Sequence, residues 1–169
     1  MAVTDDIADI VDGITQQIVW PKPVYYLSGT RLAANSEWTK GPANITEKLP
    51  LIWLLENLNE RFYGREASLE RSSDLRIFFL EETNVRQFYT KDHRGQVVGP
   101  MQELAVEFMR IITQTTRFKQ PENFQIKTYS RFGLEENRGV IKNVLDANLS
   151  GVELQLTLDI YKENSCSDF

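Results

Sequence analysis

One segment in the last part of the chain alternates strictly between apolar and polar residues. Valine, leucine or isoleucine stands at every second position from Val152 to Ile160, with Glu, Gln, Thr and Asp between them. Neighbouring side chains of a strand point to opposite faces of a sheet, so this period buries one face and leaves the other polar. The segment therefore predicts a half-buried antiparallel strand.

Two other segments carry apolar residues at the spacing of one helix face. The first runs from Ile7 to Ile18, with Thr4 as its expected N-cap and Pro21 and Pro23 at its end. The second runs from Met101 to Ile112. Both stripes predict amphipathic helices that pack on a common core.

Further strands are expected between and after the helices. The stretch Pro50 to Tyr63 also fits a helix, but we favour a strand over its first part. The expected strands are Val24–Leu27, Leu51–Glu56, Leu75–Leu80 and the alternating positions from Phe124 to Phe132, with Ile141–Leu145 as a possible partner of the last strand. This order predicts an α+β fold, an antiparallel sheet with two main helices packed on one face.

The domain organisation follows from length and composition. A chain of 169 residues with 41% apolar content suits one domain, which we expect over residues 1–163. Residues 164–169 are expected to form a flexible polar tail. Three polar stretches, 31–44, 57–73 and 82–98, are expected to be long loops or arms.

The inventory of reactive side chains is sparse. The only histidine is His93, in a polar string expected on the surface, and the only cysteine is Cys166, near the C-terminus. These two residues cannot build a His/Cys metal cluster, and there is no glycine-rich phosphate loop. We therefore assign no catalytic, cofactor-binding or metal-binding residue and expect no cofactor.

Charge and hydropathy restrict the partners and the compartment. The formal net charge of −5 opposes general adhesion to DNA or anionic membranes. No apolar run is long enough to cross a bilayer, and the first residues lack the pattern of a signal peptide. A single cysteine is typical of a protein kept in a reducing cytosol.

A metal-dependent nuclease or another nucleic-acid-processing domain is the alternative function. The nuclease would combine Asp74, Glu81 or Glu82, and a lysine such as Lys91 around one divalent ion. These residue types are common, and the acidic balance provides no evident duplex-binding face.

Aromatic and arginine side chains gather in the polar stretches. Such residues clamp single-stranded nucleic acid or build protein interfaces, and the interspersed glutamates favour an interface. Trp38 either anchors its arm on a neighbour or folds back on its own domain. Deletion of residues 31–44 is expected to leave a folded domain, because their apolar content is sparse. The candidate interface residues are Trp38, Phe62, Tyr63, Arg65, Arg86, Phe88 and Tyr89.

Four phrases of the chain resemble tail-terminator and neck-ring proteins of tailed bacteriophages. Leu49–Glu56 is similar to the strand that opens their central hairpin, and Asp74–Leu80 is similar to its return strand. Val98–Met101 resembles the lead into the second helix, and Asn148–Leu154 the lead into the last strand. The resemblance covers most of the chain from Thr4 to Ile160.

The resemblance implies a tail-terminator-like fold and a structural protein of the virion without enzymatic activity. Such proteins form rings, commonly hexamers or dodecamers, that join a portal or adaptor to the tail. Their sheets face a DNA channel or each other, and their loops and arms bind neighbouring rings. The implied partners are copies of the chain and other neck, portal or tail proteins. DNA would only pass through, no membrane would be involved, and assembly would occur in the cytoplasm of the host bacterium.

Overall fold

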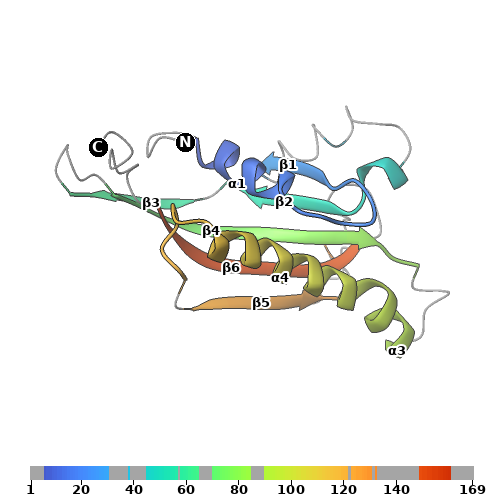
Figure 1. Ribbon diagram of the computed structural model, residues 1–169. Coiled ribbons are helices and arrows are strands. Elements are labelled where there is room, and N and C mark those ends of the chain that lie inside the picture. The colour runs from blue at the N-terminus through green and yellow to red at the C-terminus, as the bar shows by residue number, and fades with distance from the viewer. Residues whose placement is uncertain are drawn as a thin grey trace.

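A mixed six-stranded sheet organises the protein, and two helices cover one of its faces (Figure 1). This computed structural model describes residues 6–30, 38, 45–56, 58–64, 70–84, 90–121, 123–130, 132 and 149–160. The strands are β1 (Tyr25–Gly29), β2 (Leu51–Leu55), β3 (Asn59–Tyr63), β4 (Glu70–Glu82), β5 (Phe124–Tyr129) and β6 (Leu149–Ile160). The helices are α1 (Ile7–Gln16), η1 (Ile45–Lys48), α3 (Thr90–His93), η3 (Arg94–Val98) and α4 (Gly99–Gln114).

The strand order is β1-β2-β4-β6-β5, and β3 pairs with the first half of β4. All pairs are antiparallel except β1 with β2, which run parallel. The expectation of a purely antiparallel sheet is therefore wrong at this pair. The chain between β1 and β2 is long enough for the crossover that a parallel pair requires, whereas a tight turn would not be.

The main core lies between the sheet and the helices α1 and α4. The apolar stripe of α4 includes Leu104 and Phe108, and the alternating residues of β6 pack on the same side. Phe108 meets Phe79 of β4 edge to face, with ring centroids 5.7 Å apart. The α+β class, with two main helices on one face, is confirmed.

The N-cap of the first helix lies two residues later in the chain than expected. Asp6 is the N-cap, and its Oδ1 accepts a hydrogen bond from the backbone N–H of Ala8 at 3.0 Å. The prediction of Thr4 as the N-cap is wrong, because Asp6 supplies the same acceptor next to the first apolar residue of the stripe.

The stretch 57–73, expected to be a loop, contains β3 and the beginning of β4. Its polar side chains pair across the two strands instead of burying apolar surface. The guanidinium of Arg71 donates to Glu60 Oε1 at 2.5 Å, and Arg61 donates to Asp74 at 3.1 Å. Cross-strand ion pairs of this kind stabilise a hairpin that hydrophobic periodicity does not reveal.

Part of the stretch 82–98 is also structured. Residues 90–98 form α3 and η3, which lead directly into α4. Val97 and Val98 are buried and join this turn to the core. The expected loop is therefore wrong over these residues, because two adjacent valines supply the apolar contact that holds the turn in place.

The outermost strands of the sheet, β1 and β5, each pair with a single neighbouring strand in the described part of the chain. Among the described residues, β1 pairs only with β2, and β5 pairs only with β6. Four of the six residues of β5 are exposed, including Phe124. Unpaired strand edges present free backbone donors and acceptors, which makes both sides candidates for pairing with another chain.

Candidate functional site

The face of the sheet opposite the helices contains a buried carboxylate. Glu153 on β6 is 0% exposed. It accepts hydrogen bonds from Arg76 Nε at 2.5 Å, from the Tyr129 hydroxyl at 2.7 Å and from Gln155 Nε2 at 2.9 Å. These donors belong to β4, β5 and β6, so one carboxylate links three adjacent strands.

The environment of Glu153 keeps it ionised. Burial alone would raise the pKa of this carboxyl group. The hydrogen bonds from Arg76, Tyr129 and Gln155 outweigh burial and hold the pKa of Glu153 below its usual value. Arg76 is the cationic partner, and its own pKa is raised mainly by its hydrogen bond to Glu153.

A second ion pair lies on the same face, near the hairpin. Asp74 accepts hydrogen bonds from Arg61 at 3.1 Å and from the Thr157 hydroxyl at 2.8 Å. The hydrogen bond from Arg61, followed by that from Thr157, lowers the pKa of Asp74. The negative charges of Asp74 and Glu153 are thus each compensated within the chain.

A shallow cavity of about 400 Å³ lies between these two ion pairs. Amide side chains line much of it, and Asp74 and Arg76 are its only titratable lining groups among the described residues. Because its pKa is lowered, Asp74 is a weak base for the hydroxyl of Thr157. The cavity offers hydrogen bonds but no activated nucleophile.

The other half of this face is covered by a second apolar cluster. The Trp53 ring stacks on Phe78 at 5.1 Å, and Phe132 meets Phe78 at 4.9 Å. Trp53 Nε1 donates to the backbone oxygen of Gly29 at 3.1 Å, so its polar atom has a partner. Trp53 is fully buried within this cluster.

Trp38 belongs to this second cluster and is only 5% exposed. Lys48 Nζ donates to the Trp38 backbone oxygen at 2.6 Å and lies 4.8 Å from the centre of its ring. Of the two alternatives for Trp38, the structure therefore has the ring folded back on its own domain. The expectation that residues 31–44 contribute little to the core is wrong at this position.

Phe62 and Tyr63 are the exposed members of the predicted interface. They follow one another on β3 and are 51% and 44% exposed. The Arg71 guanidinium lies 5.2 Å from the centre of the Phe62 ring. Two large aromatic side chains exposed on a hairpin are typical of a contact surface. The remaining predicted interface residues, Arg65, Arg86, Phe88 and Tyr89, lie outside the described residues.

The residues of the nuclease alternative are not brought together. Asp74 and Glu81 point to opposite faces of β4, because seven positions separate them. Asp74 and Glu82 share a face but stand about 26 Å apart, at 3.3 Å per residue over eight residues. Lys91 is exposed on α3. In the described part of the chain, no three His, Cys, Asp or Glu side chains are grouped to hold a metal ion.

His93 is buried rather than exposed on a loop, which corrects the sequence-based expectation. Its Nε2 lies 3.0 Å from Ser150 Oγ, and that hydroxyl donates to the backbone oxygen of Ser130. The imidazole therefore connects α3 to the beginning of β6. Because Ser150 has no exposed surface, this pair is structural and does not offer a nucleophile.

Sequence reasoning missed the role of Glu153, which it treated as one of the polar positions of an alternating strand. The available signal was Arg76, a charged residue within the apolar segment Leu75–Leu80. A cation in a central strand requires a counter-charge on its own face. The identity of that partner depends on the register between β4 and β6, which only the fold supplies.

A comparison with models of known protein families and a comparison with curated proteins both give no match for this sequence. Within the described residues, no helix has the length and apolar character needed to cross a membrane.

Proposed function

We propose that this chain is a structural virion protein that forms a ring in the neck or tail of a tailed bacteriophage. The observation that carries this proposal is the pair of open sheet edges, β1 on one side and β5 on the other. The resemblance of its hairpin strands and helix leads to tail-terminator and neck-ring proteins supports the same function.

The two edges are matched in length and lie on opposite sides of the sheet. The edge strands β1 and β5 have five and six residues. When one edge of a copy pairs with the opposite edge of the next copy, the same rotation repeats at every contact, and a ring forms if the rotation closes. The resemblance to tail-terminator and neck-ring proteins implies that such a ring is a hexamer or a dodecamer.

The helix-free face suits a channel through which DNA only passes. Two of its carboxylates, Asp74 and Glu153, are compensated by Arg61 and Arg76 within the chain. DNA adheres to surfaces with uncompensated lysine and arginine, because phosphate binding releases counterions. A polar face on which these two arginines are paired with carboxylates would give contact without strong adhesion.

Contacts with neighbouring rings are assigned to the hairpin of β3 and β4. Phe62 and Tyr63 would bind other neck, portal or tail proteins, with Arg65, Arg86, Phe88 and Tyr89 as further candidates. Such a protein would be assembled in the cytoplasm of the host bacterium and would remain in the virion.

The mass of the purified protein in solution tests this function. Light scattering or native mass spectrometry should give six or twelve times the chain mass of 19.6 kDa, and electron microscopy should show closed rings. A monomer at every concentration would contradict the proposal. Magnesium-dependent cleavage of DNA that disappears in Asp74→Asn would instead favour the nuclease alternative.

A further inference from the structure

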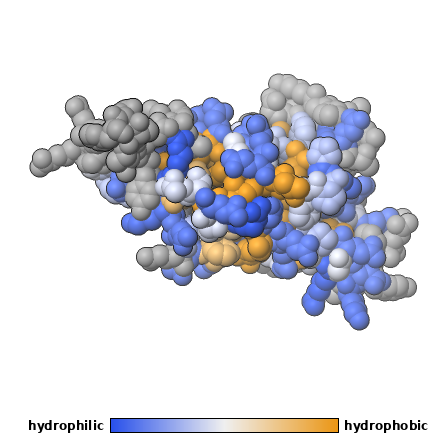
Figure 2. Space-filling view, viewed as in Figure 1, coloured by the Kyte–Doolittle hydropathy of each residue, from blue (hydrophilic) through white to orange (hydrophobic). Residues whose placement is uncertain are grey.

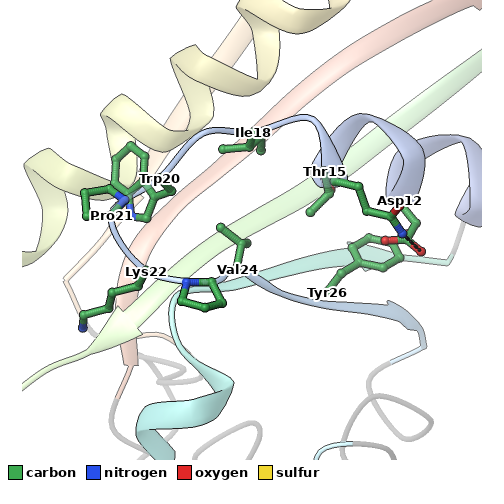
Figure 3. A pocket seen from close by; sticks show the side chains of 10 residues that line it. Asp12, Thr15, Ile18, Trp20, Pro21, Lys22, Val24 and Tyr26 are labelled. Carbon is green, nitrogen blue, oxygen red and sulfur yellow. Dashed lines mark hydrogen bonds between the residues drawn. The ribbon is translucent and has the colours of Figure 1, made fainter.

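A crevice of about 440 Å³ lies between the end of α1, the connection that follows it and the beginning of β1 (Figure 3). We call it the α1–β1 crevice. Figure 3 shows Asp12 and Tyr26 at one end and Trp20 and Lys22 at the other, with Val24 between them. The crevice is on the helix-covered side of the sheet, away from the polar face described above.

Part of the crevice wall is apolar and uncharged. Trp20, Val24 and Tyr26 are partly buried and pack on the main core. The Tyr26 hydroxyl donates to the backbone oxygen of Ala8 at 2.8 Å, and burial, followed by the negative charge of Asp12, raises the pKa of this phenol. Tyr26 therefore stays uncharged and presents an aromatic ring.

The connection that follows α1 also carries exposed apolar surface. Val19, next to Trp20, is 83% exposed. Figure 2 shows apolar surface between the positions of α1 and α4, bordered by hydrophilic residues. Exposed apolar surface with a polar border is typical of a site that binds another protein.

The charge on the helix beside the crevice is negative. Helix α1 and its cap contain the carboxylates of Asp6, Asp9 and Asp12 and no lysine or arginine. Among the described residues, none of these three carboxylates forms an ion pair. Lys22, at the far end, lies 3.9 Å from Glu81, so a carboxylate already accompanies the one cation of the crevice.

We infer that the α1–β1 crevice is the docking site for a basic segment of a partner protein. A lysine or arginine side chain would lie at the end formed by Asp12 and Tyr26, where a carboxylate and an aromatic ring both attract a cation. An apolar neighbour would contact Trp20 and Val24. A basic partner complements the negative charge of α1. A second copy of this chain, with a net charge of −5, is a poor match for that acidic helix.

The crevice includes Tyr26 of the edge strand β1, but side chains on the helix-covered face form it, whereas a ring would use the backbone edge of that strand. The inference therefore does not depend on ring formation. Peptide binding can be measured on the full-length protein in whatever oligomeric state it adopts. A failed ring proposal and a failed docking site are therefore distinguished by different measurements, the mass in solution and the peptide titration.

Trp20 provides the reporter for the test. The other tryptophans, Trp38 and Trp53, are buried. The probe is the peptide acetyl-Arg-Leu-Arg-Leu-amide at low salt, and its Arg-to-Glu counterpart is the control peptide. The basic peptide should change the tryptophan emission in a saturable way that Trp20→Phe abolishes, whereas the acidic peptide should have no effect.

The charge dependence decides the outcome. Asp12→Asn should weaken binding of the basic peptide about fivefold, as expected for one exposed ion pair. Glu82→Gln removes the same charge from the opposite face of the sheet and should change nothing. If both peptides bind equally, or Asp12→Asn and Asp9→Asn both leave the affinity unchanged while remaining folded, the inference is wrong. It is also wrong if the mass of the protein rises with concentration and only Asp12→Asn prevents this, because a second copy would then occupy the crevice.

Discussion

Single residues decide the chemistry of the helix-free face. Glu153 has no exposed surface, yet three donors hold its carboxylate in the charged form. Removing Arg76 would leave this charge buried with only neutral donors. A buried charge without its counter-ion is far more costly than the absence of the whole pair.

Arg76→Met should therefore lower the free energy of unfolding by about 3 kcal/mol. The double variant Arg76→Met, Glu153→Gln should recover part of this loss, because no buried charge then remains. Urea denaturation of the two single variants and the double variant measures the coupling. Additive losses would show that the two side chains do not act as a pair.

The same carboxylate predicts a pH dependence. The pKa of Glu153 is lowered in the folded protein relative to about 4.3 in the unfolded chain. The contribution of Glu153 to the free energy of unfolding is therefore fully present above about pH 4.3. This contribution is lost as the pH falls through the lowered pKa of the folded protein. The difference in unfolding free energy between the wild type and Glu153→Gln should be largest near neutral pH and should shrink in acid.

Chemical denaturation between neutral pH and about pH 3 measures this difference. The contribution of Asp74, whose pKa is also lowered, is common to both proteins and cancels. Glu82→Gln, at an exposed position, is the control and should follow the wild type. A gap that stays constant with pH would mean that Glu153 is not held in its charged form.

At the scale of elements, α4 gives the sheet its main cover. It contacts both β4 and β6, and Figure 1 shows it lying across these central strands. Strands β4 and β6 also approach closely at Gly151, where a Cβ atom would lie 1.9 Å from the backbone oxygen of Phe79. This position therefore requires glycine, although the sequence indicates only the start of a strand there.

Leu104→Ala and Phe108→Ala should each lower the free energy of unfolding by about 2–5 kcal/mol, because both side chains are fully buried beneath α4. Val106→Ala on the same helix is the matched control. Since Val106 is 55% exposed, this change should stay within about 0.5 kcal/mol. Thermal unfolding monitored by circular dichroism compares the three variants. Equal stability of all three would mean that α4 does not pack on the sheet as described.

For the whole molecule, the two faces and the two edges of the sheet have different roles. The helix side holds the main core and the α1–β1 crevice, whereas the opposite face combines an aromatic cluster with a polar half. The edges β1 and β5 remain open among the described residues. Assembly through the edges would leave both faces available for other contacts.

Phe124→Lys should break a ring that forms through the β5 edge. Phe124 is 46% exposed, so the stability of the single chain should change by no more than about 0.5 kcal/mol, while a charge on an edge strand opposes pairing. Val106→Lys changes an exposed apolar residue on α4, away from the sheet edges, and is the control. Light scattering should give a smaller mass for Phe124→Lys alone. An unchanged ring would place the contact elsewhere.

The sequence by itself determined the elements whose apolar period is regular. Two apolar patterns, the alternation from Val152 to Ile160 and the stripe from Met101 to Ile112, can each bury their apolar side chains in only one type of element. The strand β6 and the helix α4 could therefore be predicted. The hairpin strand β3 could not, because cross-strand ion pairs hold it and its residues are exposed.

Only the tertiary structure decided which distant side chains meet. The parallel pairing of β1 with β2, the burial of Trp38 and His93, and the contact of Arg76 with Glu153 depend on how the chain returns to the sheet. The same distinction holds for the candidate interface residues. An exposed aromatic such as Phe62 can be suspected from composition, but its exposure is set by the strand that pairs with it. Local periodicity determines which face of a helix or strand is buried. Strand register and the crossover connections determine which side chains become neighbours, and both depend on contacts between residues far apart in the chain.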